Sequence, residues 1–223
     1  MGYIPIFLDV TGRRCMVVGG GEVAARKVES LLEAGARVVI VSPSLCAPLA
    51  AIVDRGLATH IARAYRRGDI AGCVLVYAAT DEPEIHRALA EEARALGILL
   101  NVVDVPELCT FIAPAVAKQG ELQIAISTGG ASPAFAARLR RELEKQFGSE
   151  YGIALKVLRA ARRRLHGEEI DPLERMQRLK DLAESPILEA IRAHDPAELD
   201  RILALHLGDG VNLAALGIDV ADG

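Results

Sequence analysis

A glycine-rich turn between an apolar run and a helix-like segment constrains this chain more than any other feature. The run at 15–18 stops at Gly19, Gly20 and Gly21, and the helix-like segment begins at Glu22. The spacing Gly-x-Gly-x-x-Ala matches a dinucleotide-binding turn, in which glycines allow the sharp bend and the close approach of a pyrophosphate. The free N–H groups and the dipole of the following helix then face the phosphates.

The residues after the turn favour a βαβ unit around it. Apolar side chains recur at helical spacing from Val23 to Leu32, and a second apolar run at 37–41 follows Gly35. A unit of about 30 residues with this order is the context that the motif requires. A glycine turn that binds no ligand stays open as the alternative, since glycines alone are weak evidence.

The pattern of alternating strands and helices continues to residue 104. We expect strands at 59–63, 73–78 and 98–103 and a helix at 45–54. A second helix starts after Asp81 as N-cap, has Pro83 in its first turn and runs to about Leu96. This alternation predicts an α/β fold with a doubly wound, Rossmann-like parallel sheet. Ligands bind outside the carboxyl ends of such strands, which places 19–22, 42–44, 79–81 and Asp104 around one crevice.

Beyond Asp104 the pattern changes twice. Runs at 111–116 and 122–127 predict two strands around a turn at 118–120, followed by a helix with Ser132 as N-cap. From Ser149 the chain is helical, with helix starts predicted at Asp171, Ser185 and Asp195, each followed by proline. We therefore divide the chain into a nucleotide-binding domain at 1–112, a small α+β dimerisation segment at 113–148 and a helical C-terminal domain at 149–223.

Composition narrows the class of protein. The chain has 223 residues, 51% of them apolar, and a net charge of −4, which argues against a general nucleic-acid binder. No stretch approaches the ~20 apolar residues of a membrane span, and the N-terminus lacks the pattern of a signal peptide. The four cysteines show no metal-binding or disulfide spacing, so we expect reduced thiols and a cytoplasmic protein.

Six short motifs, taken together, resemble a known family. They are Pro5-Ile6-Phe7-Leu8, Val17-Val18-Gly19-Gly20-Gly21-Glu22-Val23-Ala24, Ala78-Ala79-Thr80-Asp81, Asn101-Val102-Val103-Asp104-Val105-Pro106, Phe111-Ile112-Ala113-Pro114 and Ser127-Thr128-Gly129-Gly130-Ala131-Ser132-Pro133. In this order they resemble the dehydrogenase/ferrochelatase part of siroheme synthases, the precorrin-2 dehydrogenases. The resemblance covers about residues 3 to 165.

The resemblance implies an activity and several site residues. It implies NAD-dependent oxidation of precorrin-2 to sirohydrochlorin, in some members iron insertion with Fe²⁺ as a substrate, and a homodimer formed through the middle segment. The aspartate essential to the chemistry corresponds to Asp104. Together with the strand ends, the resemblance gives the cofactor-binding candidates Gly19, Gly20, Gly21, Glu22, Val23, Pro43, Ser44, Thr80 and Asp81.

Two carboxylates at the predicted crevice have alternative roles. Asp104 could simply close an Asx-turn, but apolar neighbours would desolvate it and suit it to proton transfer. Asp81 is favoured as a helix cap over a catalytic acid. The usual ribose-binding acid about 20 residues after the glycines is missing, so NADP is not excluded and NAD is preferred only through the resemblance.

The tetrapyrrole substrate carries many carboxylates, which arginines bind well. The low-ranked substrate-binding candidates are therefore Thr128, Gly129, Gly130, Arg138 and Arg141, although a solvated helix face explains the arginines equally well. The five histidines show no metal-ligand spacing, and we expect packing or surface roles and no resident metal. A nucleotide-sensing Rossmann module without catalysis is the alternative function, and another NAD-dependent oxidoreductase is a weaker one.

Overall fold

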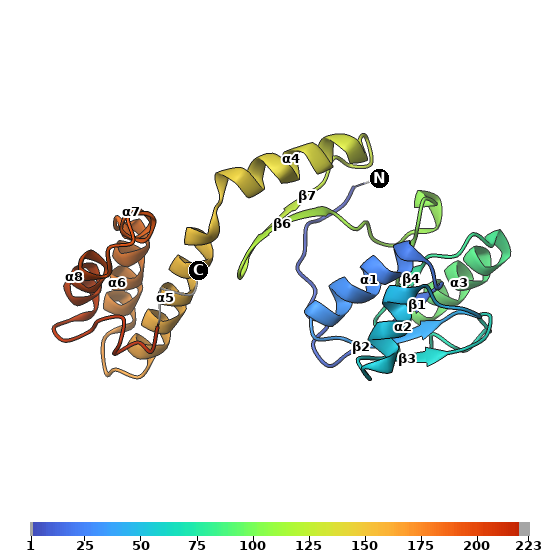
Figure 1. Ribbon diagram of the computed structural model, residues 1–223, viewed down its shortest axis with the longest axis horizontal. Helices are drawn as coiled ribbons and strands as arrows, with labels where there is room; N and C mark the ends of the chain where they lie inside the picture. Colours follow the sequence, from blue (N-terminus) through green and yellow to red (C-terminus); the bar gives the residue numbers. More distant parts are fainter. Residues whose placement is uncertain (1, 219–223) are drawn as a thin grey trace. The chain divides into compact units, whose positions relative to one another are not determined.

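The computed structural model describes residues 2–218, and the chain divides into two compact units that meet at Ala113 and Pro114. The first unit is built on a five-stranded parallel sheet in the order β3-β2-β1-β4-β5 (Figure 1). Its strands are β1 Arg14–Val18, β2 Arg37–Val41, β3 Ala58–Ile61, β4 Leu75–Ala78 and β5 Leu99–Val102. The predicted doubly wound parallel sheet is confirmed.

Helices cover both faces of this sheet because its strands are apolar on both sides. On one face, α1 Glu22–Glu33 and α2 Ala47–Asp54 pack against Val17 and Ile40, and on the other α3 Pro83–Leu96 packs against Met16 and Val76. All four of these strand side chains are fully buried. Val18, at the end of β1, pairs with Val41 and Ala78, so three strands end at one level.

The connection between β3 and β4, residues 62–74, contains no helix. It is fixed instead by Glu92 on α3, which is 5% exposed and accepts hydrogen bonds from the Tyr65 hydroxyl and from the Gly68 N–H at 2.9 Å. Burial, and secondarily the bond to Glu92, raises the pKa of Tyr65. Arg63 and Asp69 close the connection with an ion pair at 2.7 Å. In place of the usual crossover helix, this connection is held by a buried carboxylate that accepts two hydrogen bonds.

The second unit begins with an antiparallel hairpin of β6 Ala115–Gln119 and β7 Leu122–Ile126, against which α4 Pro133–Gln146 packs. The turn is Gly120-Glu121, with φ +57° at Gly120, so the predicted turn at 118–120 was too early. The predicted strand at 111–116 was also misplaced. Thr110 and Phe111 bond back to β5, through Thr110 N to the Leu100 carbonyl at 2.8 Å and Asn101 Nδ2 to the Phe111 carbonyl at 3.1 Å.

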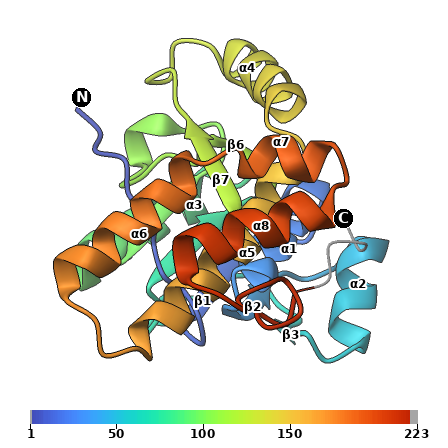
Figure 2. The same ribbon diagram turned by 90° about the vertical axis from the view of Figure 1, so that its left-hand side faces the viewer.

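Four helices complete the second unit: α5 Ser149–His166, α6 Pro172–Glu184, α7 Ile187–Arg192 and α8 Pro196–Leu207 (Figure 2). They enclose a core that includes Val157, Leu165, Leu182 and Leu203. The hairpin belongs to the same unit because Gly120 lies directly against Gly152 of α5. Separation of 113–148 from 149–223 as distinct domains remains a prediction, and residues 219–223 lie outside the described part of the chain.

Three of the four predicted proline-linked helix caps in this unit are confirmed. Ser132, Asp171 and Asp195 accept hydrogen bonds from N–H groups in the first turns of α4, α6 and α8. The predicted start at Ser185 was wrong by one residue, since Pro186 is the N-cap of α7. Ser185 ends α6 instead, where its hydroxyl donates to the Leu182 carbonyl at 2.6 Å.

Glu92→Leu is expected to lower the free energy of unfolding by about 2 kcal/mol, because it strips the Gly68 N–H and the Tyr65 hydroxyl of their buried acceptor. Glu92→Gln keeps an acceptor for Gly68 and should lose less than half of that. Glu91→Leu is the matched control, since Glu91 is exposed and its ion pair with Arg67 is long, at 3.8 Å. Urea unfolding followed by circular dichroism measures all three, and equal losses in both Leu variants would contradict the proposed role of Glu92.

Candidate functional site

The backbone at the end of β1 lies so close to its neighbours that two glycines are sterically required. A Cβ on Gly19, whose φ is +132°, would collide with the carbonyl of Ala79 after β4. A Cβ on Gly20 would collide with the carbonyl oxygen of Ser44 after β2. These glycines therefore join three strand ends at the point where the strand order reverses, which is where doubly wound sheets bind ligands.

Gly21 differs from Gly19 and Gly20 because packing within the protein does not require a glycine at this position. A Cβ there would have nothing within 4 Å. Gly21 is the N-cap of α1, and no side chain caps the first N–H groups of that helix. An open helix N-terminus beside a glycine without a packing partner fits the pyrophosphate of a dinucleotide. Glu22 and Val23 begin the helix, Glu22 exposed and Val23 partly buried.

The segment after β2 is rigidly held and uncharged. The Ser42 hydroxyl donates to the Ser44 carbonyl at 2.7 Å, and Cys46 N donates to the Gly20 carbonyl at 2.7 Å. His60 on β3 bonds the Ser42 carbonyl through Nε2 at 2.9 Å. Pro43 and Ser44 are left exposed beside the glycine turn, where the sequence placed cofactor contacts.

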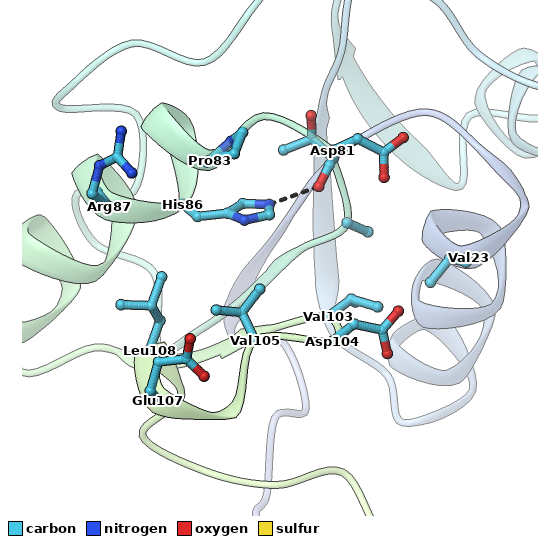
Figure 3. A pocket seen from close by; sticks show the side chains of 12 residues that line it. Val23, Asp81, Pro83, His86, Arg87, Val103, Asp104, Val105, Glu107 and Leu108 are labelled. Carbon is cyan, nitrogen blue, oxygen red and sulfur yellow. Dashed lines mark hydrogen bonds between the residues drawn. The ribbon is translucent and has the colours of Figure 1, made fainter.

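A cavity of about 600 Å³ opens at the ends of β4 and β5 (Figure 3). It brings together four residues predicted from the sequence, Val23, Thr80, Asp81 and Asp104. His86, Arg87 and Glu107 also line this cavity, although no sequence motif indicated them. Helical side chains lean toward the N-terminus of their helix, so His86, in the first turn after Pro83, could have been placed at this site.

Asp81 does not cap α3. The N-cap is Glu82, which makes no side-chain capping bond, and Pro83 is the first helical residue. The reason is local, because the residue before a proline is restricted to extended backbone, and Glu82 has φ −94° and ψ 104°. Asp81 is left exposed on the cavity wall, with its carboxylate directed away from α3 in Figure 3.

Asp104 occupies a turn at the end of β5 in an unusual backbone conformation. Val105 N bonds the Val102 carbonyl at 3.3 Å, and Asp104 inside this turn has φ +60°. A left-handed conformation in a residue other than glycine costs roughly 1–2 kcal/mol, though aspartate tolerates it better than most. Below the turn, Cys109 Sγ contacts the Val102 carbonyl at 3.2 Å, and the short helix η1 Pro106–Leu108 follows.

The Asp104 carboxylate is not used to build the fold. It is exposed, and within residues 2–218 no hydrogen bond or ion pair holds it. The alternative role in an Asx-turn is therefore wrong, and so is the expectation of a desolvated carboxylate, because the turn carries the residue out of the apolar strand end. A strained backbone that presents a free carboxylate to a cavity is typical of functional sites.

The substrate-binding candidates all lie in the second unit. The Thr128 hydroxyl bonds both the N–H and the carbonyl of Ser132 at 3.2 Å, so it shapes the turn before α4. Gly129 and Gly130 form that turn with φ +63° and +86°. Arg138 and Arg141 are both exposed, and Arg138 is paired with Glu142 at 2.7 Å. Their role toward a substrate remains a prediction.

In the part of the chain that the structure describes, no helix combines the length and apolar character needed to cross a membrane. No group of three or more His, Cys, Asp or Glu side chains in residues 2–218 is arranged to hold a metal ion. All four cysteines are free thiols, and Cys15 and Cys73 are buried as expected.

Known protein families match parts of both units of the chain. Residues 6–115 match a family model described as "Putative NAD(P)-binding", and residues 119–146 match one described as "Sirohaem biosynthesis protein central". The siroheme synthase of Pseudomonas aeruginosa strain LESB58 is 38% identical over 217 residues, covering 97% of this chain and 47% of that protein. The siroheme synthase of Methylobacillus flagellatus is 45% identical over 152 residues, covering 68% of this chain and 32% of that protein.

A solved structure agrees in fold. "SirC, precorrin-2 dehydrogenase" superimposes with a TM-score of 0.77 at 22% identity, covering 90% of this chain and 98% of that one. The nucleotide-binding family model, together with the open N-terminus of α1, supports a nicotinamide cofactor. The chain belongs to the siroheme synthase family and spans about half the length of the curated relatives that it matches.

Proposed function

We propose that this chain oxidises precorrin-2 to sirohydrochlorin with NAD. The observation that carries the proposal is the position of Asp104. Its free carboxylate is held in a strained turn and lines the same cavity as Val23 at the start of α1. Membership of the siroheme synthase family supports the substrate, and the shared fold of a precorrin-2 dehydrogenase agrees with it. A nucleotide sensor would need no strained carboxylate at this place, which disfavours the regulatory alternative.

Different residues would bind the cofactor and accept the proton. The N–H groups of Gly21, Glu22 and Val23 would hold the pyrophosphate, and Ser44 would contact the ribose. A bound nicotinamide supplies the hydride acceptor. Oxidation removes one hydride and one proton from the reduced tetrapyrrole, so a single carboxylate is enough to balance the reaction, and Asp104 accepts that proton.

NAD is proposed over NADP because the segment that faces the adenosine ribose carries no cation. Residues 42–46 contain only serines, proline, leucine and cysteine. The basic side chain nearest in sequence, Arg37, lies at the opposite end of β2, where its Nε donates to the Gly12 carbonyl at 2.7 Å. A 2′-phosphate would therefore lack the charged partner that NADP enzymes provide. The four free thiols agree with a reducing cytoplasm as the place of action.

Iron insertion into sirohydrochlorin is proposed as a second activity of the same cavity. Asp81 and Asp104 both line it, and both are exposed. Carboxylates are suitable for receiving protons that the tetrapyrrole nitrogens lose when Fe²⁺ enters. The iron is a substrate in this proposal.

A homodimer formed through residues 113–148 is also proposed. The hairpin of β6 and β7 has only two strands, and such a sheet is marginally stable unless something covers it. Ala136 is the one buried residue of α4, and Phe135 is 49% exposed. A second copy of this segment would cover both the open strand edges and the apolar side of α4.

The reaction and its base can be tested together by anaerobic incubation with precorrin-2 and NAD, followed by absorbance. The parent chain should form sirohydrochlorin only when NAD is present, and a further spectrum should appear when Fe²⁺ is added. Asp104→Asn should lower the dehydrogenation rate by about 100-fold or more, since it removes the proton acceptor but suits the left-handed turn. NAD affinity should change less than about twofold.

Asp104→Gly separates chemistry from backbone strain. Glycine is unstrained at φ +60°, so this variant should be up to about 1 kcal/mol more stable than the parent while equally inactive. Full activity in either variant would refute the assignment of Asp104. A parent chain that makes no sirohydrochlorin with NAD would refute the proposed function as a whole.

Phe135→Asp should convert the dimer to a monomer, because it places a charge on the exposed apolar side of α4. Aspartate in the first turn is favourable for the helix, so α4 itself should persist. Leu173→Asp is the matched control, since Leu173 is 71% exposed at the start of α6, outside the proposed interface. Light scattering after size-exclusion chromatography measures both, and a dimeric Phe135→Asp or a monomeric parent would contradict the proposal.

A further inference from the structure

We propose that His86 is a positioning residue that anchors the Thr80–Asp81 segment and thereby shapes the wall of the nucleotide cavity. The proposal rests on the nicotinamide-nucleotide site of the proposed function, and assigns a role to a histidine for which the sequence indicated only a packing or surface role. His86 lies in the first turn of α3 and is 7% exposed. Its ring lines the same cavity as Asp104.

The chemistry of the two groups decides which one donates in the hydrogen bond between His86 and Thr80. His86 Nε2 lies 2.6 Å from the backbone carbonyl oxygen of Thr80. A carbonyl only accepts, so Nε2 carries a hydrogen and donates it. Figure 3 shows the ring directed at the backbone of the segment, with the Asp81 side chain on the opposite side. The bond therefore turns the Thr80 carbonyl toward α3 and leaves Asp81 facing the cavity.

This bond is the sole hydrogen bond of Thr80 or Asp81 in the described part of the chain. β4 has ended at Ala78, the last main-chain bond to β1 is that of Ala79 N, and Pro83 has no N–H to offer. Without His86, nothing polar would fix the two residues between Ala79 and the helix.

The segment after β2 provides a comparison within the same site. Ser42 to Cys46 is held by five hydrogen bonds, which involve Ser42 N, the Ser42 hydroxyl, Cys46 N, the Cys46 carbonyl and His60. His60 makes the same kind of contact as His86, from a ring nitrogen to a backbone carbonyl. Loss of the His60 contact would remove one hydrogen bond of five, whereas loss of His86 removes the sole hydrogen bond of its segment. The two histidines thus make the same contact with different expected consequences.

A cavity wall that is already ordered binds its ligand more tightly, because no conformational entropy is lost on binding. Loss of the His86 bond should therefore weaken NAD binding while leaving catalysis at saturating NAD largely intact. A purely structural role would instead lower the melting temperature and leave the affinity of the folded fraction unchanged. These two outcomes can be measured separately.

The test uses three variants of the full chain. His86→Leu fills the space but cannot donate, and His86→Gln places an amide nitrogen where Nε2 of the ring lies. His60→Leu is the matched control in the other segment. NAD affinity is measured by calorimetry in the absence of precorrin-2, melting temperature by calorimetry without ligand, and kcat at saturating NAD.

We expect His86→Leu to raise the Kd for NAD about tenfold, and His86→Gln and His60→Leu to remain within about threefold of the parent. The melting temperature and kcat of His86→Leu should stay close to the parent values. The proposal is overturned if His86→Leu binds NAD like the parent, if Gln restores nothing, or if His60→Leu is equally impaired. A parent chain that binds no NAD would refute the nucleotide site itself, and with it the proposed function.

Discussion

The close approach of three backbone segments at the end of β1 is the constraint on which the site depends. Gly19 lies against the carbonyl of Ala79, and Gly20 against that of Ser44, at distances where no side chain fits. These contacts hold the ends of β1, β2 and β4 at the same edge of the sheet, where α1 begins. The cavity that contains Asp104 is a consequence, because β5 continues the same sheet edge.

The regular part of this arrangement could be predicted from sequence because its signals are local. Continuous apolar runs between glycines gave the parallel sheet, and Ser132, Asp171 and Asp195 capped helices where a polar residue precedes a proline. The family resemblance added Asp104, which no local rule distinguishes from other turn residues.

What the sequence could not provide depends on contacts between distant residues. Glu92 meets Tyr65 and Gly68 across more than twenty positions. The strand predicted at 111–116 failed for the same reason, since Thr110 and Phe111 bond to β5. The contact of His86 with Thr80 spans only six residues, and the lean of side chains in the first helical turn could have indicated it. The predicted N-cap at Asp81 was wrong for a local reason. Pro83 restricts Glu82 to extended backbone, so Glu82 is the N-cap of α3.

The contact between Gly120 and Gly152 has a mechanical consequence for the second unit. A Cβ on Gly152 would lie 3.1 Å from the Gln119 carbonyl, so hairpin and helix meet backbone to backbone, with no side chain between them to yield. An ion pair between Arg159 and Glu121 reinforces the junction. The hairpin is therefore not a free arm. A load applied to its strands passes directly into α5, and through the core around Val157 and Leu165 into the helices behind it.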